Sequence, residues 1–452
     1  MKRPTPVNAE SPFGFDEFFF STTDKRGVIR YGNDVFVRVS AYPKEAMVGA
    51  PHSLIRHPDM PRAVFKEFWE FLKADKPVGA YVKNLAGDGH YYWVYAFAFP
   101  IQDGYLSVRF KPSSETFGVV QNLYSDVLHY ESQDHSLEES HAYLLEKIAE
   151  LGFADYESFM VKAVLEELKS RATHLQNSEM KYEVKEAEQI AEVTKATTHK
   201  LEEVFEKLRG FQGNSQNLEE AIQSLDEGFQ QLKFISLNMK IAAAKFGDLA
   251  ASLGVVSHEF SVLSGTIEKH LGGLAGFVDD LAGVVKKCVL RVAALNVQML
   301  MVDFFVRESI AKLGSSDNAF EEMLQNQKAF SDLFGQYSKN LQSEFSELQA
   351  GIAVIESAMQ EIAKFVTGLE VVRQIGAIES SRTAEIKSIF ANYLSSMDSF
   401  ILLLRKCTGE IKRGVESLSS NSDFIVTSIR GISGNVDKIF DQAASMESRE
   451  AS

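Results

Sequence analysis

The distribution of proline divides this chain into two parts. All ten prolines of its 452 residues lie between Pro4 and Pro112, and so do both tryptophans, Trp69 and Trp93. Proline costs about 3 kcal/mol inside a helix, because it lacks the backbone N–H and its ring clashes with the preceding turn. The proline-free remainder is rich in residues that long helices favour. We therefore expect a compact mixed domain up to residue 115, followed by a helical body.

Composition narrows the class of protein. The formal net charge of −15 argues against non-specific binding to nucleic acid, which needs a basic face. Two cysteines cannot make a disulfide framework and favour a reducing compartment. Residues 1–10 have no signal-peptide core, and the uncharged part of the apolar stretch 284–306 is about 11 residues long, whereas a membrane helix needs about 20. We expect a cytoplasmic protein without a membrane span.

The first part of the chain alternates strand and helix patterns. Residues 1–14 are expected to be disordered, and residues 60–74 are amphipathic with helical spacing. Strand patterns occur at residues 18–22, 28–31, 78–84, 90–99 and 104–110. This order predicts an α+β domain over residues 15–115, in which short helices cover one face of a five-stranded antiparallel sheet.

The element order and several motifs resemble the PAS sensor fold, in particular the flavin-binding PAS domain of bacterial aerotaxis receptors. The most distinctive motif is Arg56-His57-Pro58-Asp59-Met60-Pro61. The other residues that carry the resemblance are Ser21-Thr22-Thr23-Asp24, Asn33 to Phe36, Ser40-Ala41-Tyr42, Trp69, Val82-Lys83-Asn84 and His90-Tyr91-Tyr92-Trp93-Val94. In that family the PAS pocket holds FAD, whose redox state reports oxygen or electron-transport status.

The resemblance also implies which residues surround the flavin. By position they are Arg56, His57, Asp59, Asn84 and Tyr92. The chain has Val78 where the family usually has a tryptophan. Two alternatives remain open at this point. His57 or His90 could ligate heme iron instead, and a PAS domain without a cofactor could serve only as a dimerisation module.

The chemistry of several of these side chains suits a flavin without reference to the family. Arg56 offers a fork of donors for a phosphate or a carbonyl edge. Asn84 can both donate to and accept from the amide edge of a ring. Trp69 and Trp93 can stack on an aromatic ring.

Helical patterns fill the rest of the chain. Residues 116–175 predict three connector helices, and the segments that follow have apolar residues at alternating steps of three and four, which is typical of a coiled-coil seam. The first seam is Leu201, Val204, Leu208, Phe211, Leu218, Ile222, Leu225, Phe229, Leu232, Met239, Ala243 and Phe246. The second is Leu253, Val256, Phe260, Leu263, Ile267, His270, Leu274, Phe277, Leu281, Val284 and Cys288. Two seams flanking a glycine-bounded turn predict an antiparallel helical hairpin over residues 176–310.

The turn of this hairpin resembles the tip of methyl-accepting chemotaxis receptors, over residues 234–248 and 253–260. In that family the tip contacts a histidine kinase and its coupling protein. The implied partner surface comprises Leu237, Asn238, Lys245, Val256 and Glu259. The family's tip glutamate is Ala242 here and its tip arginine is Lys245, so the tip lacks charged contacts that a kinase complex would use.

A second hairpin is predicted over residues 311–440, with residues 441–452 as a frayed tail. Residues 371–382 share the small-residue spacing of residues 234–245, at an offset of 137 residues from Lys245 to Arg382. The return arm of this hairpin is predicted to bury Ile386, Ile389, Tyr393, Met397, Leu404 and Ile411. Two such hairpins can pack as one bundle, within a chain or across a dimer. We expect a homodimer or higher oligomer through the helices.

No motif in the chain indicates catalysis. It has no phosphate-binding Gly-Lys loop and no His/Cys cluster with zinc spacing. His258-Glu259 is not followed by the ATP-binding glycine boxes of a kinase. The interpretation we favour is a non-enzymatic sensor, in which FAD in the PAS pocket controls a helical body that meets a chemotaxis-type partner near residues 234–262. A heme-based oxygen sensor and a cofactor-free adaptor are the alternatives.

Overall fold

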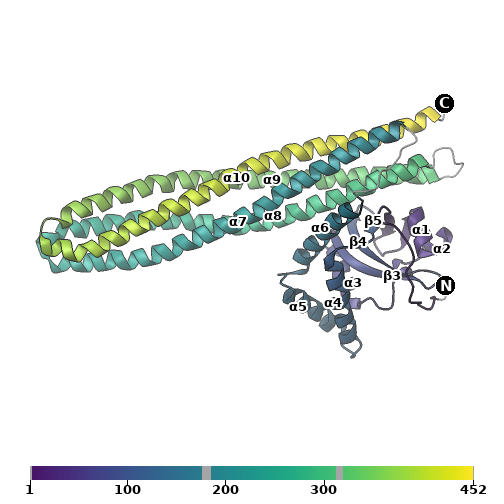
Figure 1. Cartoon of the computed structure of the whole chain (residues 1–452), viewed down its shortest axis with the longest axis horizontal. Coiled ribbons are helices and arrows are strands. Elements are labelled where there is room, and N and C mark those ends of the chain that lie inside the picture. The colour runs from purple at the N-terminus through teal and green to yellow at the C-terminus, as the bar shows by residue number, and fades with distance from the viewer. Residues whose placement is uncertain (1–2, 176–184, 312–318, 451–452) are drawn as a thin grey trace. The chain divides into compact units, whose positions relative to one another are not determined.

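The computed structural model describes residues 3–175, 185–311 and 319–450 (Figure 1). It divides into two compact units, one comprising Met1–Glu202, Val289–Lys339 and Ile429–Ser452, the other Glu203–Cys288 and Asn340–Ser428. In the described ranges, none of the helices combines the length and the apolar character that a membrane crossing requires.

The N-terminal domain is built on a five-stranded antiparallel sheet in the order β2-β1-β5-β4-β3. The strands are β1 (Phe19–Asp24), β2 (Ile29–Gly32), β3 (Val78–Leu85), β4 (Tyr91–Ile101) and β5 (Gly104–Phe110). Between β2 and β3 lie α1 (Asp34–Ser40), α2 (Lys44–Met47), a 3-10 turn (His52–Ile55) and α3 (Arg62–Lys73). The predicted α+β fold with five antiparallel strands, followed by a helical body, is confirmed.

Strand alternation gives this sheet two different faces. In the register of β3, β4 and β5, Asn84 lies opposite Tyr92 and Ala98 lies opposite Ser107, so these four residues share one side. We call this the inner face; it lies toward α3 and the 3-10 turn. The outer face is formed by the intervening residues and is aromatic. Its aromatic residues on β3 and β4 include Tyr81, Trp93, Tyr95, Phe97 and Phe99.

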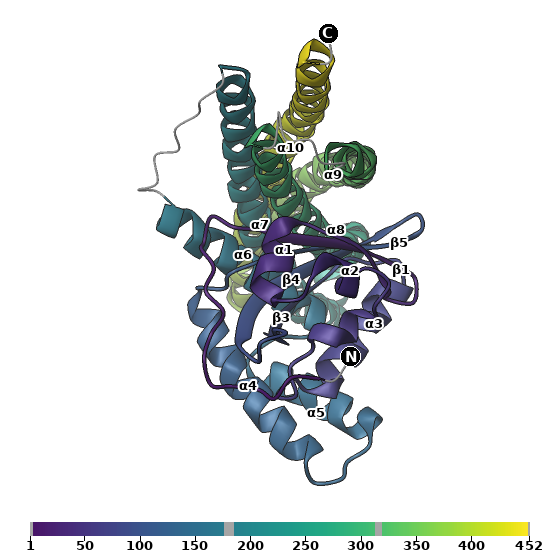
Figure 2. The same ribbon diagram turned by 90° about the vertical axis from the view of Figure 1, so that its right-hand side faces the viewer.

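Three helices follow the sheet and pack on the same domain. They are α4 (Glu115–Glu131), α5 (Leu137–Glu150) and α6 (Tyr156–Leu175), and we call them the helical cap (Figure 2). Ser136 begins α5 with a capping box, since its side chain accepts from the Glu139 amide while the Glu139 side chain accepts from the Ser136 amide. The cap joins the outer face at β3, where the Tyr156 hydroxyl donates to the Gly79 carbonyl at 3.0 Å.

A buried carboxylate links the cap to the sheet. Glu167 of α6 is inaccessible to solvent. It accepts hydrogen bonds from the Tyr81 hydroxyl (2.9 Å), the Ser113 amide (2.7 Å), and the amide and hydroxyl of Ser114 (3.2 and 2.6 Å). A buried charge with this many donors is well satisfied, so Glu167 holds α6 to β3 and to the segment that leaves β5.

Both ends of the chain are ordered in part, although residues 1–14 were predicted to be disordered and residues 441–452 to be a frayed tail. The amides of Val7 and Ser11 donate to the carbonyls of Gly89 and Tyr91, both at 2.8 Å, so the N-terminal segment lies along the β3–β4 turn. The prediction of disorder for residues 1–14 is therefore wrong for this segment, because its backbone groups find partners on the turn. Helix α10 continues to Glu450, so it includes most of the predicted frayed tail. Residues 1, 2, 451 and 452 lie outside the described residues.

The helical body consists of α7 (Lys185–Lys245), α8 (Ala251–Ala311), α9 (Ala319–Ser380) and α10 (Ala384–Glu450). In the second unit they form a four-helix bundle in which each helix contacts two neighbours. The contacts that join neighbours are Ser236–Ser257 (α7–α8), His270–Phe365 (α8–α9), Gln349–Asp423 (α9–α10) and Phe229–Phe400 (α7–α10). One chain therefore supplies both hairpins of the bundle.

Most of the predicted seam positions are buried in the bundle. Phe246, Leu263, His270 and Val284 are only half-buried, and in the return arm Ile389 is exposed and Tyr393 is half-buried. Phe390 and Leu394, one position further along, are buried in their place. That part of the prediction is wrong because two apolar series run one residue apart along this helix, and packing selects the second. The side chains of Phe211 and Phe277 lie outside the described residues.

The two turns of the bundle lie at the same end (Figure 1). The first contains Gly247, whose φ of +54° is in the left-handed region that glycine tolerates. The second is formed by residues 381–383. The Ser252 hydroxyl donates to the Glu379 carboxylate at 2.6 Å and connects the two hairpins close to their turns.

Candidate functional site

The N-terminal domain contains a cavity of about 340 Å³ between the inner face of the sheet and α3. Helix α3 contributes Phe65, Phe68, Trp69 and Leu72, which lie on one side of the helix at the spacing expected for a buried stripe. The sheet contributes the small side chains Ala96, Ala98 and Ser107, which leave the space open, together with Val82 and Asn84. A cavity of this volume is within the range of small-molecule sites.

The lining of the cavity is cationic. Arg26, Arg56 and Arg109 line it, and none of the described residues that line it is an aspartate or a glutamate. Arg109 is only 4% exposed, and burial lowers its pKa to about 10, so its guanidinium remains charged at neutral pH. A buried charge without a counter-ion is costly. The cavity is therefore suited to a ligand that carries negative charge or strong acceptors.

Arg109 is held by two neutral partners. Its guanidinium donates to the Ser21 hydroxyl at 3.1 Å and lies 2.6 Å from His52 Nε2. Burial, together with the charge of Arg109, holds the pKa of His52 well below its usual value, so this imidazole is neutral and accepts from Arg109. This arrangement fixes the guanidinium in place without cancelling its charge.

Several polar atoms of the lining have no hydrogen-bond partner within the described structure. They are Asn84 Nδ2, Arg56 Nε and Ser107 Oγ. A buried donor or acceptor left unsatisfied costs about 1–3 kcal/mol. These three atoms around one cavity are therefore available to bond to a polar ligand.

Of the residues predicted to hold a cofactor, Arg56, Asn84 and Trp69 line this cavity. The guanidinium carbon of Arg56 lies 3.5 Å from the centre of the Phe65 ring, which orients the side chain against α3. Trp69 meets Tyr105 edge to face, with ring centres 5.5 Å apart.

His57 and Asp59 lie outside the cavity lining. Arg56 forms an antiparallel bridge with Asn84, so adjacent side chains in this short extended segment point to opposite sides. His57 is buried away from the cavity, where Nδ1 accepts from the Asp59 amide at 3.1 Å. The Asp59 carboxylate pairs with Lys83 Nζ at 2.6 Å. The prediction that His57 and Asp59 contact the cofactor is therefore corrected, because neither residue lines this cavity.

Tyr92 and Trp93 also do not line the cavity. Tyr92 is on the inner face but is buried beside Phe19, at a ring distance of 5.7 Å. Trp93 is on the outer face, where its ring centre is 5.3 Å from that of Phe117 in α4. A tryptophan in this register cannot stack on a ligand in the cavity, because the sheet separates the two.

The heme alternative loses the two histidines on which it depended. His57 is outside the cavity lining, and His90 pairs with Asp88 near the β3–β4 turn at 3.0 Å. His52 is the histidine of the lining, and its Nε2 already faces Arg109.

Sequence reasoning missed His52, Ser107 and Arg109. The signal for the last two was present, since Ser107 and Arg109 alternate with Leu106, Val108 and Phe110 in β5, as expected for a strand with one apolar and one polar face. The sequence does not show that α3 and the 3-10 turn cover this polar face.

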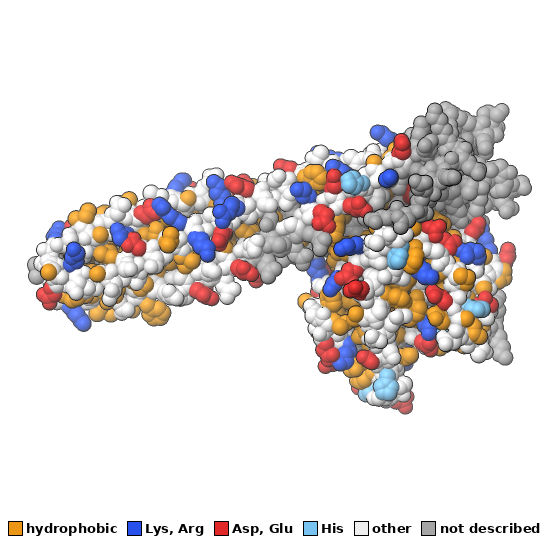
Figure 3. Space-filling view, viewed as in Figure 1, with side chains coloured by type: hydrophobic (Ala, Val, Ile, Leu, Met, Phe, Trp, Pro, Cys, Tyr) orange, Lys and Arg blue, Asp and Glu red, His pale blue; other side chains and the backbone are white. Residues whose placement is uncertain are grey.

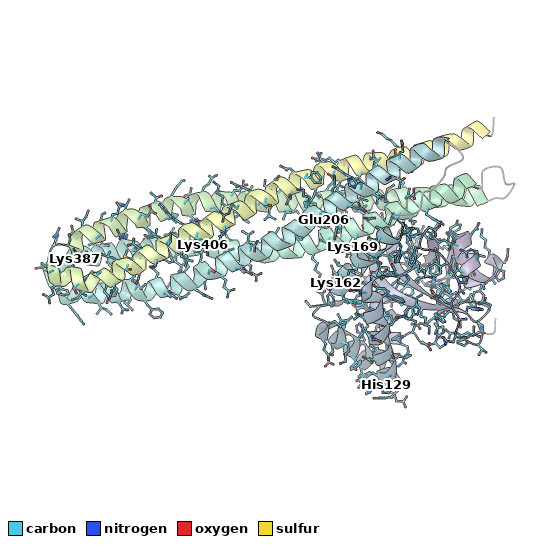
Figure 4. The ribbon with its side chains drawn as sticks, in the orientation of Figure 1. His129, Lys162, Lys169, Glu206, Lys387 and Lys406 are labelled. Carbon is cyan, nitrogen blue, oxygen red and sulfur yellow. The ribbon has the colours of Figure 1, made fainter. Side chains whose placement is uncertain are left out.

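The predicted partner surface is mostly exposed at the end of the bundle. Leu237, Asn238, Lys245 and Glu259 are exposed, whereas Val256 is 5% exposed and contacts the position of Gly376 inside the bundle. Val256 is therefore a core residue, which corrects its assignment to the surface. Figure 3 shows hydrophobic side chains on the surface of the bundle near its turns (left), and Figure 4 shows Lys387 beside the second turn.

Exposed apolar residues recur at equivalent positions of the two hairpins. Phe234 and Ile241 are exposed on α7, and the residues at the 137-residue offset, Val371 and Ile378, are exposed on α9. We call Phe234, Leu237 and Ile241 the first tip stripe. Exposed hydrophobic patches are typical of interaction surfaces, since the fold itself gains nothing from them.

Comparison with known proteins agrees with the architecture of the N-terminal domain. Residues 29–108 match the family model of the PAS fold. The aerotaxis receptor of Escherichia coli (strain K12) is 38% identical over 126 residues, which cover 27% of this chain and 25% of the receptor. The chain thus spans about a quarter of that relative's length. The N-terminal domain is a PAS domain similar to that of the aerotaxis receptor, as the sequence predicted.

Two solved structures are similar to this chain at lower identity. The crystal structure of a PAS domain from Colwellia psychrerythraea is 21% identical, covers 21% of this chain and 85% of that chain, and has a TM-score of 0.20. The light-state structure of the blue-light photoreceptor Aureochrome1 LOV is 19% identical, covers 25% of this chain and 91% of that chain, and has a TM-score of 0.20.

Proposed function

We propose that this protein is a non-enzymatic signal-transduction sensor whose PAS cavity binds a flavin of the FAD type. The redox state of the flavin controls the helical body, and the tip of the bundle meets a signalling partner of the chemotaxis type. The observation that carries this proposal is the cationic cavity, which buries Arg109 without a carboxylate and leaves the donors of Asn84 and Arg56 without partners.

The side chains of the cavity match the parts of a flavin. Asn84 has a free amide donor for a carbonyl or ring nitrogen, and Trp69 supplies an aromatic wall. Arg109 places a positive charge at the inner face, while Arg26, whose side chain is largely exposed, can reach a phosphate. When bound, a flavin supplies a ring whose charge and protonation change with its redox state. The fixed charge of Arg109 responds to such a change, because the buried site screens it weakly.

Strand β3 provides a route from the cavity to the helical cap. Val82 and Asn84 line the cavity, while Tyr81 and Lys83, which alternate with them in the same strand, are on the other face. There the Tyr81 hydroxyl bonds to Glu167 of α6. A shift of β3 that follows the ligand therefore acts on α6, the last helix before the bundle. An interaction change of a few kcal/mol is enough to shift an equilibrium between two packings.

The output surface is proposed at the first tip stripe. Its exposed side chains and the neighbouring Lys245 and Glu259 offer an apolar centre with a polar rim, which is the usual anatomy of a protein interface. The resemblance of this segment to chemoreceptor tips supports a coupling protein or kinase as the partner.

Absorbance of the full-length protein tests the cofactor. After expression with ample riboflavin, we expect a flavin spectrum at one equivalent, and we expect Asn84→Ala and Arg109→Leu to reduce its occupancy at least tenfold. Trp93→Phe is the matched control, since Trp93 lies on the outer face and its replacement leaves the flavin bound. A colourless wild-type protein would contradict the flavin and favour the cofactor-free adaptor, and a Soret band would favour heme.

A further inference from the structure

A histidine and two glutamates converge where α3 meets α5. Glu67 and Glu70 are on α3, three residues apart and therefore on the same side of the helix, and His141 is on α5. One ligand atom from each of the three lies within 4.8 Å of the others. His141 Nε2 contacts the Glu67 carboxylate directly and lies 3.9 Å from the Glu70 carboxylate.

The two inner members of this cluster are largely buried. The Glu67 and His141 side chains are 9% and 14% exposed, whereas that of Glu70 is 51% exposed. The cluster is thus open to solvent on the Glu70 side. A metal ion bound here would take three protein ligands and keep a position for water, which is the arrangement of three-ligand zinc sites.

Glu67 has few partners for a buried carboxylate. Glu167, the other buried glutamate of the domain, accepts hydrogen bonds from Tyr81, Ser113 and Ser114. Within the described part of the chain, the hydrogen bond of Glu67 is the one with His141. A buried carboxylate normally collects several donors or a cation, because desolvation is otherwise uncompensated. Glu67 therefore has acceptor capacity left for a cation, and it faces two further ligand atoms.

One local cation competes for this site. Lys66 Nζ lies 2.8 Å from the Glu70 carboxylate and 3.8 Å from that of Glu138. An ion pair at this degree of exposure contributes little to stability, so a metal ion can displace it. Lys66 then retains Glu138 as a partner.

We propose that Glu67, Glu70 and His141 bind a divalent transition-metal ion of the zinc class. One imidazole and two carboxylates suit zinc, whose bonds to nitrogen and oxygen are about 2.0–2.2 Å long, so the exposed Glu70 must move inward to complete the site. Helix α3 lines the ligand cavity on its other side through Phe68 and Trp69. The bound ion would therefore tie the wall of the cavity to the helical cap.

Calorimetric titration of the metal-stripped full-length protein with Zn²⁺ tests this site, with Co²⁺ absorbance as a second readout. We expect one saturable equivalent with micromolar or tighter affinity, and at least a tenfold loss of affinity in Glu70→Gln and His141→Gln. Glu70 is exposed enough for its variant to fold normally. The controls are Glu146→Gln, an exposed glutamate of α5, and His129→Gln on α4, an exposed histidine that Figure 4 shows at the end of its helix.

Three outcomes overturn the proposal. They are no saturable binding by the wild type, unchanged binding in both ligand variants, or an equal loss of binding in the two controls. The site does not depend on the flavin, so wild-type protein that is colourless and still binds one zinc ion would contradict only the proposed function.

Discussion

The two faces of the PAS sheet are made by alternate residues of the same strands, and they differ in the space that they leave. On the inner face, the small side chains of Ala96, Ala98 and Ser107 leave a cavity. Its lining includes Arg26, Arg56 and Arg109. On the outer face, Phe97 and Phe99 are fully buried and their ring centres are 4.9 Å apart. Side-chain volume, rather than backbone path, thus decides which face can hold a ligand.

The comparison also applies to buried polar groups. On the outer face, the Tyr81 hydroxyl and Glu167 satisfy each other and fix α6. On the inner face, Asn84 Nδ2 and Ser107 Oγ line the cavity and have no partner within the described structure. The cavity side of the sheet thus has unpaired polar atoms that a ligand can satisfy, which is expected of a binding layer.

The largest expected effect on stability comes from a comparison of Phe97 and Ala98, which are adjacent in β4 and on opposite faces of the sheet. Phe97→Ala should lower the free energy of unfolding of the PAS domain by about 3–5 kcal/mol, because it removes a fully buried ring. Ala98→Leu should lower this free energy less, because its side chain enters the cavity rather than a packed core, but it should abolish flavin absorbance. Denaturant titration followed by tryptophan fluorescence reports on this domain, because both tryptophans belong to it. Equal losses of stability would contradict the assignment of the two faces.

A smaller effect distinguishes two buried tyrosines. Tyr81→Phe removes a donor to Glu167 and should cost about 1–3 kcal/mol, with faster amide hydrogen exchange in α6. Tyr92→Phe removes a hydroxyl that has no partner in the described structure, so we expect a change of less than about 0.5 kcal/mol in the ligand-free protein. If Tyr92→Phe is the more damaging of the two, the Tyr92 hydroxyl has a stabilising partner and the contrast between the two tyrosines fails.

The sequence alone predicted the fold and three of the residues that line the cavity. Arg56, Asn84 and Trp69 could be placed because a motif, a strand and an amphipathic helix each point to one position. Trp93 could not be placed, because a shift of one residue in the β3–β4 register moves a side chain to the other face. Arg109 could not be distinguished from a surface arginine, since its burial depends on helices that are distant in the sequence. The same limit applies to Phe390, where packing chose between two neighbouring apolar series.

Acid should lower the free energy of unfolding, because the folded protein keeps His52 neutral. Burial and the charge of Arg109 hold the pKa of His52 well below the ordinary 6.5, so the unfolded chain binds more protons than the folded one as pH falls below 6.5. Between pH 6.5 and 5.5 this costs the folded state about 1 kcal/mol. His57, whose pKa is lowered mainly by burial, contributes in the same direction from outside the cavity. His52→Gln should make the difference in unfolding free energy between pH 7.5 and 5.5 smaller, and an unchanged difference would contradict a neutral His52.

The smallest effect on stability is expected at the first tip stripe, and it extends the comparison to the helical body. Leu237 is exposed on α7, and Leu232, five residues earlier, is buried in the bundle. Leu237→Asp should change the free energy of unfolding by less than about 0.5 kcal/mol, whereas Leu232→Asp places a charge in the core and should cost several kcal/mol. Circular dichroism during thermal unfolding measures both. An apolar side chain that the bundle can lose without cost is available for a partner, in the same way that the open inner face of the sheet is available for a ligand. A large loss in Leu237→Asp would instead assign the stripe to packing.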